Sequence, residues 1–343
     1  MEMSERKQKI LSAVVEHYIL SGEPIGSKAL SQALDITVSP ATIRNEMSEL
    51  AEMGYLEQPH TSAGRIPSQA GYRYYVDKLM PHRTLSLQDQ RLIAGMIPKN
   101  AGDPEQVLES VGAALARMTG CAAIATTPAG QADVIRKVEL VPVGKYLSMI
   151  ILLTSNGILK NRVCRMDTEL SAELLEMFYQ ITEKHFLHYP VAEVSTAMLQ
   201  TLAANLGEKA FTMTPLLFAL AELCQDAAEA EIHLDGQTNL LGCRDYEGNV
   251  RELLEFLAHR EALHRLVTSN QEVLKVLIGR ENLYRELSNS SMILSKYNVG
   301  GKAGGVIGII GPTRIDYKQL IPSIEYLSVL VGNLLSDALG DDL

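Results

Sequence analysis

The segment of the chain whose residue types most clearly predict chemistry is Ser39–Leu56, SPATIRNEMSELAEMGYL. If it is helical, one side of its first turns presents small and polar groups. An Asn side chain can form two hydrogen bonds with adenine, an Arg side chain can bond guanine or a phosphate, and an Ala or Thr methyl can contact the thymine methyl. We therefore expect this segment to bind base edges in a major groove, through Ser39, Ala41, Thr42, Arg44, Asn45 and Ser48.

Local signals predict that this segment is a helix. Ser39 is a favourable N-cap, Pro40 suits the first helical position, and Gly54 suits the residue just past the end. At about 100° per residue the apolar side chains gather on the side opposite the polar ones. The expected inward-facing residues are Ile43, Met47, Leu50, Ala51 and Met53.

Two further helices are expected before this segment. Apolar residues recur with helical spacing from Glu5 to Leu20, and Ser21-Gly22-Glu23-Pro24 ends that helix. A short helix over Lys28–Leu34 follows, with Ser27 as its cap and a turn at Asp35–Thr37. A helix, a short second helix, a turn and a capped third helix is the order of a helix-turn-helix.

A β-hairpin is expected directly after the third helix. Tyr55–Gln58 forms a short strand, Ser62–Gly64 a turn and Arg65–Pro67 the returning strand, which together form a wing. His60 and Arg65 are expected near its tip, where they can contact phosphate or the minor groove. In the following helix, Gly71–Met80, a face containing Tyr72, Tyr75, Val76 and Leu79 is expected to pack on the wing.

The charge of the chain does not by itself predict DNA binding. The full chain has 31 Lys+Arg and 41 Asp+Glu, a net charge of −10. Residues 1–83 have 9 basic and 10 acidic side chains, a balance of −1, and the remaining 22 basic and 31 acidic residues give −9. The DNA-binding hypothesis therefore depends on motif geometry, and a helical domain for protein contacts is the alternative.

Length and composition predict two or three globular domains. The chain has 343 residues, 46% of them hydrophobic. We expect no membrane span, because the longest apolar run, near Met149–Leu153, is only strand-sized, and no signal peptide at the N-terminus. The four cysteines lie far apart without a C-x-x-C pair, which is typical of a reducing cytoplasm.

The pattern after residue 83 predicts an α+β region. Residues 84–119 are expected to be helical with breaks at Pro98 and Gly102–Pro104, and an apolar strand follows at 121–127. An antiparallel meander is then expected over 136–143, 146–155 and 158–166. Helices are predicted over 169–187, 191–206, 215–230 and 250–266, strands over 273–278, 291–297 and 305–310, and a final helix over 320–339. A sheet interrupted by a helical block indicates one α+β domain with an inserted subdomain.

No segment of the sequence predicts catalysis or a cofactor. Gly300–Arg314 is rich in glycine, but it lacks the P-loop pattern and joins strand to strand, so a hairpin connection is expected. His185 and His188 lie close together in sequence without a third ligand at a suitable spacing. We therefore expect a protein that is not an enzyme and that holds no cofactor or metal.

Six strings give the chain a family resemblance over nearly its whole length. They are GSKAL (26–30), the segment 39–56, QPHTSAGRIPS with GYRYYVD (58–77), IGREN (278–282) and IGIIGPTRIDY (307–317). In these strings the chain resembles the HrcA family of bacterial heat-inducible transcription repressors. The resemblance implies a winged helix-turn-helix at 1–83, a GAF-like domain made of 84–168 and 270–343, and a mainly helical dimerisation subdomain inserted at 169–269.

The same resemblance implies the biology of the family. It implies a cytoplasmic homodimer that binds an inverted-repeat operator, the CIRCE element, upstream of chaperone operons and represses them in the absence of stress. It also implies dependence on the GroEL chaperonin. Two alternatives stay open: a small-molecule sensor whose GAF-like domain controls DNA binding, and a protein-docking adaptor without a DNA target.

Overall fold

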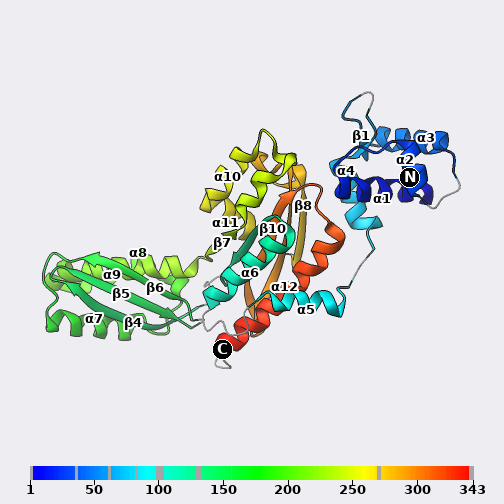
Figure 1. The fold of residues 1–343 in the computed structure, drawn as a ribbon. Coiled ribbons are helices and arrows are strands. Elements are labelled where there is room, and N and C mark those ends of the chain that lie inside the picture. Colours follow the sequence, from blue (N-terminus) through cyan, green and yellow to red (C-terminus); the bar gives the residue numbers. More distant parts are fainter. Residues whose placement is uncertain are drawn as a thin grey trace.

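The computed structural model describes residues 3–34, 38–60, 63–81, 84–97, 104–128, 133–155, 157–268 and 272–339, which form an elongated molecule of three parts (Figure 1). A small helical unit lies at one end, a five-stranded sheet with helices in the middle, and a three-stranded sheet with helices at the other end. The turn expected at Asp35–Thr37 and the helix breaks expected at Pro98 and at 102–103 lie outside the described residues.

The N-terminal unit (residues 3–81) contains three helices and a hairpin. The helices are α1 (Glu5–Ser21), α2 (Ser27–Ala33) and α3 (Pro40–Glu52), and the hairpin strands are β1 (Leu56–Glu57) and β2 (Ile66–Pro67). These bounds confirm the predicted helices and hairpin strands to within about two residues. One detail differs: Ser27 is already helical, and Gly26 occupies the cap position without a side-chain bond.

The helix after the hairpin, α4 (Gln69–Tyr74), continues as one wider turn over Tyr75–Leu79, in which the Met80 N–H donates to the Tyr75 carbonyl at 2.7 Å. Tyr74 lies with its ring 5.2 Å from that of Tyr55 beside β1, whereas Tyr72 and Tyr75, which were predicted to face the wing, have contacts elsewhere. The Tyr75 hydroxyl donates to Glu16 of α1 at 3.2 Å, and the Tyr72 ring lies 6.0 Å from that of Tyr317 near the C-terminus. The hairpin strands have two residues each and are too short to cover this face.

The central domain is a five-stranded antiparallel sheet in the order β7-β3-β10-β9-β8. Its strands are β3 (Ala122–Thr126), β7 (Ile232–Asp235), β8 (Leu274–Ile278), β9 (Ser290–Val299) and β10 (Lys302–Pro312). The structure confirms that the glycine-rich segment joins strand to strand, because β9 and β10 form a hairpin that turns at Gly300 and Gly301, both with positive φ.

Helices cover both faces of the central sheet. On β3, Ala123 and Ala125 belong to the core that contains α6 (Pro104–Thr119) and α12 (Tyr317–Leu339). The alternate residues Ala122 and Ile124 belong to the core that contains α10 (Val250–Ala258) and α11 (Arg260–Thr268). The short helix α5 (Leu87–Gly95) contacts α12. Alternate side chains of each strand point to opposite faces, so both faces of these strands are apolar.

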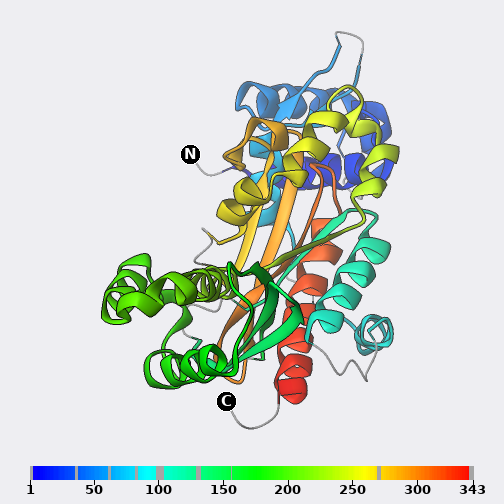
Figure 2. The same cartoon turned by 90° about the vertical axis from the view of Figure 1, so that its left-hand side faces the viewer.

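The remaining strands form a separate three-stranded sheet in the order β4-β5-β6, which lies away from the central sheet in Figure 1 and faces the viewer in Figure 2. The strands are β4 (Ile135–Gly144), β5 (Leu147–Thr154) and β6 (Leu159–Arg165), and they confirm the predicted meander. Their inner face shares one apolar core with α7 (Ala172–His185), α8 (Thr196–Asn205) and α9 (Ala210–Ala228).

The segment that contains this three-stranded sheet and its helices begins and ends on neighbouring strands of the central sheet. Thr126 of β3 pairs with Ile232 of β7, and beside them the Thr127 N–H donates to the Glu231 carbonyl at 2.9 Å. Residues 128–230 are therefore inserted into a β3–β7 hairpin, and we call them the insert.

This arrangement differs from the division 84–168, 169–269 and 270–343 expected from the sequence. The meander lies in the insert, while α10 and α11 pack on the central sheet. Alternating hydrophobicity identifies a strand but carries no information about which sheet the strand joins. None of the described helices is long and apolar enough to cross a bilayer.

Candidate nucleic-acid interface

The first turn of α3 is capped by a serine side chain. The Ser39 hydroxyl accepts from the Thr42 N–H at 3.2 Å, as the sequence predicts. Four of the six residues predicted on this helix are exposed: Ser39, Ala41, Arg44 and Asn45. The other two, Thr42 and Ser48, are half-buried, and the Ser48 hydroxyl donates to the Arg44 carbonyl at 3.0 Å.

The opposite face of α3 is fixed to α1 by packing and by charge. Ile43, Met47 and Leu50 are buried as expected, whereas Met53, which follows the last helical residue, is 46% exposed. Glu46 is also buried, which the sequence analysis missed, although its spacing of three from Ile43 indicates the same face.

Glu46 accepts hydrogen bonds from Arg6, one of them at 2.8 Å from Nε, and Lys7 Nζ lies 3.4 Å from its other oxygen. Burial alone would raise the pKa of Glu46, but the Arg6 hydrogen bonds and the Lys7 charge outweigh burial and lower it. The carboxylate is therefore charged at neutral pH and fixes α3 against α1.

The hairpin is joined to the segment between α1 and α2 through the residue that precedes β2. The Ile25 N–H donates to the Arg65 carbonyl at 3.1 Å, and the Arg65 N–H donates to the Ile25 carbonyl at 2.9 Å. Gly64 allows this close approach, because a Cβ there would lie 2.4 Å from the carbonyl carbon and oxygen of Ile25. Arg65 thus lies beside Ile25 at the point where the hairpin loop meets the strands. The sequence had predicted it near the tip of the hairpin. His60 is exposed, and Ser62 of the expected turn lies outside the described residues.

A hollow of about 500 Å³ lies between α3, the start of α2 and the hairpin. Three of the predicted residues line it together: Arg44, Ser48 and Arg65. The sequence analysis missed its other polar wall residues, Ser27 and Gln58, because nothing in their local pattern shows that α2 and the hairpin meet. The Gln58 amide donates to the Ala63 carbonyl at 3.0 Å, which holds the two sides of the hairpin together.

The ion pairs of the N-terminal unit lie away from this hollow. They engage Arg6, Lys7 and Glu16 on α1, and Arg73 on α4. Within the described part of the chain, Arg44 and Arg65 form no ion pair, so both guanidinium groups are available to an anionic ligand. A unit with nearly balanced charge thus presents two unpaired cations on one side.

Among the described residues, neither the best candidate metal ligands nor the buried thiol of Cys121 is suited to chemistry. Glu105, Glu231 and His233 bring ligand atoms within 4.8 Å of one another, but Glu231 already pairs with Lys160. Burial raises the pKa of Cys121 to about 11, so this thiol stays protonated at neutral pH.

Comparison with known proteins gives the family. Residues 105–321 match the family described as HrcA protein C terminal domain. The heat-inducible transcription repressor HrcA of Thermoanaerobacter pseudethanolicus is 33% identical over 345 residues, covering 100% of both chains. That of Halalkalibacterium halodurans is 34% identical over 340 residues, covering 98% of each chain.

A solved structure described as a hypothetical protein at 2.2 Å resolution shares the fold, with 26% identity and a TM-score of 0.68 over 98% of this chain and 100% of that one. The full-length similarity to these repressors and the family match over 105–321 lead to one conclusion: the chain belongs to the HrcA family of heat-inducible transcription repressors.

Proposed function

We propose that this protein represses heat-shock chaperone operons by binding an inverted-repeat operator of the CIRCE type as a dimer. In this proposal the N-terminal unit is a winged helix-turn-helix, and the central five-stranded domain is GAF-like. Helix α3 enters the major groove, and the hairpin lies along the neighbouring backbone. The observation that carries the proposal is the convergence of Arg44, Ser48 and Arg65 around one hollow beside the exposed first turn of α3.

Each residue has a role that matches its chemistry. Asn45 and Arg44 form base contacts, and Ala41 and Thr42 offer methyl groups to thymine. Arg65 binds a phosphate where the hairpin meets the helices, and the exposed His60 contacts the backbone farther out. Ser39 and Ser48 complete the polar face of the helix.

We further propose that two copies pair through the insert. On β5, Ile150 and Leu152 point into the insert's core, so Leu147, Met149, Ile151 and Leu153 point to the other face. Met149 pairs with Val163 and Leu153 with Leu159, so β6 extends this apolar face. Leu147, Leu159 and Val163 are 43%, 59% and 55% exposed. This face is apolar along β5 and has the polar residues Glu139, Asn161 and Arg165 beside Ile151 and Leu147. Exposed apolar residues rimmed by polar ones are typical of a protein interface.

A two-fold dimer requires an operator with two-fold symmetry, which is an inverted repeat. The test uses sedimentation and operator titration of the full chain and of a variant in which Asn-Gly replaces residues 128–230. Because Thr127 and Glu231 are already paired, the two-residue turn closes the β3–β7 hairpin. We expect a dimeric full chain and a monomeric variant that binds the full repeat about 10²–10⁴-fold more weakly.

Binding to a single half-site is the control in this test, and it should be the same for both proteins. A full chain that stays monomeric on and off DNA while protecting both half-sites would refute the dimer. So would an insert-deleted variant that binds the full repeat as tightly as the full chain.

The family further suggests that the GroEL chaperonin maintains the active repressor. Under this proposal heat diverts the chaperonin to unfolded clients, and the chaperone genes are then expressed. Operator titration of refolded protein, with and without chaperonin, measures the effect. A higher active fraction with chaperonin is expected, and an unchanged fraction would remove the chaperonin from the proposal.

A further inference from the structure

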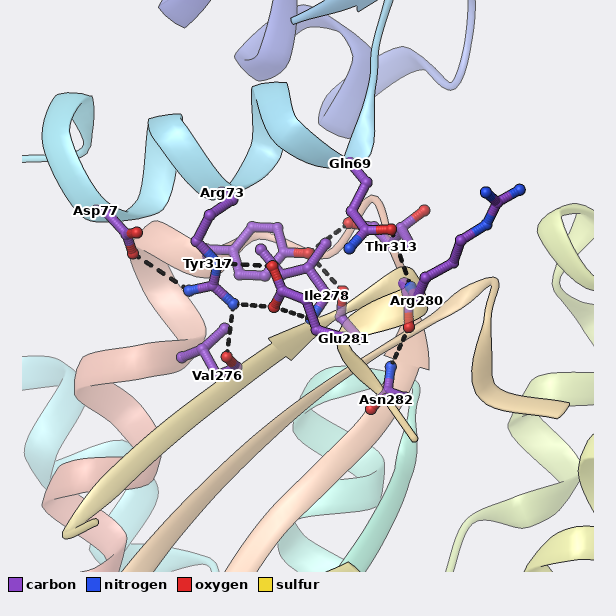
Figure 3. A network of polar contacts seen from close by, with 12 residues as sticks. Gln69, Arg73, Asp77, Val276, Ile278, Arg280, Glu281, Asn282, Thr313 and Tyr317 are labelled. Carbon is purple, nitrogen blue, oxygen red and sulfur yellow. Dashed lines mark hydrogen bonds and ion pairs between the residues drawn. The ribbon is translucent and has the colours of Figure 1, made fainter. Parts of the chain in front are cut away.

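The N-terminal unit and the central domain meet at a polar joint built from segments far apart in the sequence (Figure 3). We define the joint by Gln69 and Arg73 of α4, the loop Gly279–Glu281 after β8, and Tyr317 at the start of α12. Its residues come from the GYRYYVD, IGREN and GPTRIDY strings and their immediate neighbours. None of them belongs to the proposed DNA-binding face.

The centre of the joint is the ion pair between Arg73 and Glu281. Arg73 Nε donates to Glu281 Oε1 at 2.9 Å, and a second guanidinium nitrogen donates to Oε2. Arg73 also donates to the Val276 carbonyl at 2.7 Å and to Asp77 at 3.2 Å (Figure 3). These bonds hold the guanidinium group in one orientation. A planar two-point bond of this kind fixes orientation as well as distance.

Glu281 is held in place from its own side. Its Oε2 accepts from the Ile278 N–H at 2.9 Å, so the carboxylate is positioned by the loop that carries it. Burial alone would raise the pKa of Glu281, but the hydrogen bonds and charge of Arg73, together with the Ile278 N–H and Gln69, outweigh burial and lower it. The pair is therefore ionised at neutral pH.

Two neighbouring contacts make the joint rigid. The Arg280 N–H donates to Gln69 Oε1 at 3.0 Å, and the approach is close because residue 279 is glycine with φ +56°. A Cβ at Gly279 would lie 3.0 Å from Gln69 Oε1. On the other side, the buried Tyr317 ring lies 6.0 Å from that of Tyr72.

A separate contact lies at the end of α1. Gly22 ends α1 in the left-handed conformation and packs on the Arg314 guanidinium, since a Cβ there would be 3.3 Å from its central carbon. Arg314 is held by Asp245 through two contacts of 2.8 Å. With contacts at Arg73, Gln69 and Gly22, the N-terminal unit cannot rotate on the central domain without breaking at least one of them.

We propose that Arg73 and Glu281 are positioning residues that set the distance and angle between the two α3 helices of a dimer, and so the half-site spacing that the repressor accepts. This inference rests on the proposed function. In a two-fold dimer, the placement of each DNA-binding unit on its own central domain determines where α3 meets the duplex. One added base pair moves a half-site by about 3.4 Å and rotates it by about 35°, so a rigid joint accepts few spacings.

The test measures operator affinity as a function of spacer length. Full-chain wild type, Arg73→Gln, Glu281→Gln and the double variant are titrated with inverted repeats whose spacer is lengthened or shortened by one to five base pairs. The glutamine at 281 retains an oxygen for the Ile278 N–H. Arg251→Gln, which removes an exposed ion pair with Glu255 on α10, is the matched control.

We expect wild type and the control to prefer one spacer by at least about tenfold over spacers two base pairs longer or shorter. In the joint variants this preference should fall to about threefold or less, while affinity for a single half-site stays within twofold. The double variant should resemble either single variant, because the two substitutions remove the same interaction. Arg73→Lys retains the charge without the two-point bond and should give an intermediate preference.

Two results would overturn the inference in distinguishable ways. Joint variants with the wild-type spacer profile would show that Arg73 and Glu281 do not set the spacing, and would leave the proposed function intact. A wild-type chain that binds no inverted repeat better than random DNA would refute the proposed function as well.

Discussion

Replacing Arg65 with alanine removes one cation from the hollow beside α3 and leaves the hairpin in place. Both bonds that anchor the hairpin to Ile25 use the backbone of Arg65, so the substitution retains them. Arg44 and the other wall residues of the hollow are also unchanged. The variant thus measures what the guanidinium contributes to DNA binding.

The expected magnitude follows from counterion release. Each phosphate contact contributes about −0.9 to the slope of log affinity against log salt. Two copies of Arg65 in a dimer give about two contacts, so the slope should flatten by about 1.8. Salt rises fourfold between 50 and 200 mM. Over this range the factor by which affinity falls should be about 12 times smaller for the variant than for wild type.

Fluorescence anisotropy with an inverted-repeat duplex and with a random duplex, each at several salt concentrations, measures both slopes. The slope should flatten on both duplexes, because a phosphate contact carries no base information. Lys78→Ala, at an exposed lysine beyond α4, is the control and should retain the wild-type slope. A slope for Arg65→Ala within 0.3 of wild type would show that this residue does not contact phosphate.

Three further substitutions test other parts of the interface. Asn45→Ala should cost about 1–3 kcal/mol on the operator and far less on random DNA, measured by the same titration; equal losses would mean that Asn45 contacts only the backbone. Gly64→Ala places a Cβ 2.4 Å from the Ile25 carbonyl, so the hairpin should detach, with at least tenfold weaker operator binding and faster proteolysis; Gly95→Ala, which meets open space, should bind like wild type. The lowered pKa of Glu46 contributes stability that is present above its ordinary value of 4.5 and is lost as the pH falls through the folded value. Glu46→Gln should therefore be less stable than wild type at pH 7, and urea unfolding from pH 7 to 3 should show this difference shrinking as the pH falls; a constant difference would contradict the assignment.

The sequence alone was sufficient to predict α3. Ser39, Pro40 and Gly54 act through the backbone of their own neighbours, and the apolar spacing from Ile43 to Leu50 depends only on helix geometry. The exposed side of α3 is simply the side without apolar residues. For this reason Arg44 and Asn45 could be placed on it without any knowledge of the rest of the molecule.

Contacts between distant segments could not be predicted from the sequence. Arg65 was expected near the hairpin tip because it follows the turn, but its pairing with Ile25 holds it against the segment between α1 and α2. Glu46 has an ordinary helical position, and only the approach of Arg6, 40 residues away, makes a buried carboxylate stable there.

The tertiary structure also decided how the chain is divided. The strands of the meander were predicted, but their local pattern is the same in either sheet, and only the pairing of Thr127 with Glu231 shows that residues 128–230 are one insert. The joint between Arg73 and Glu281 spans 208 positions. Helix caps and hydrophobic periods act over a few residues and are therefore visible in the sequence. Strand partners, buried charges and joints between domains depend on which distant surfaces pack together, and that is determined only when the whole chain folds.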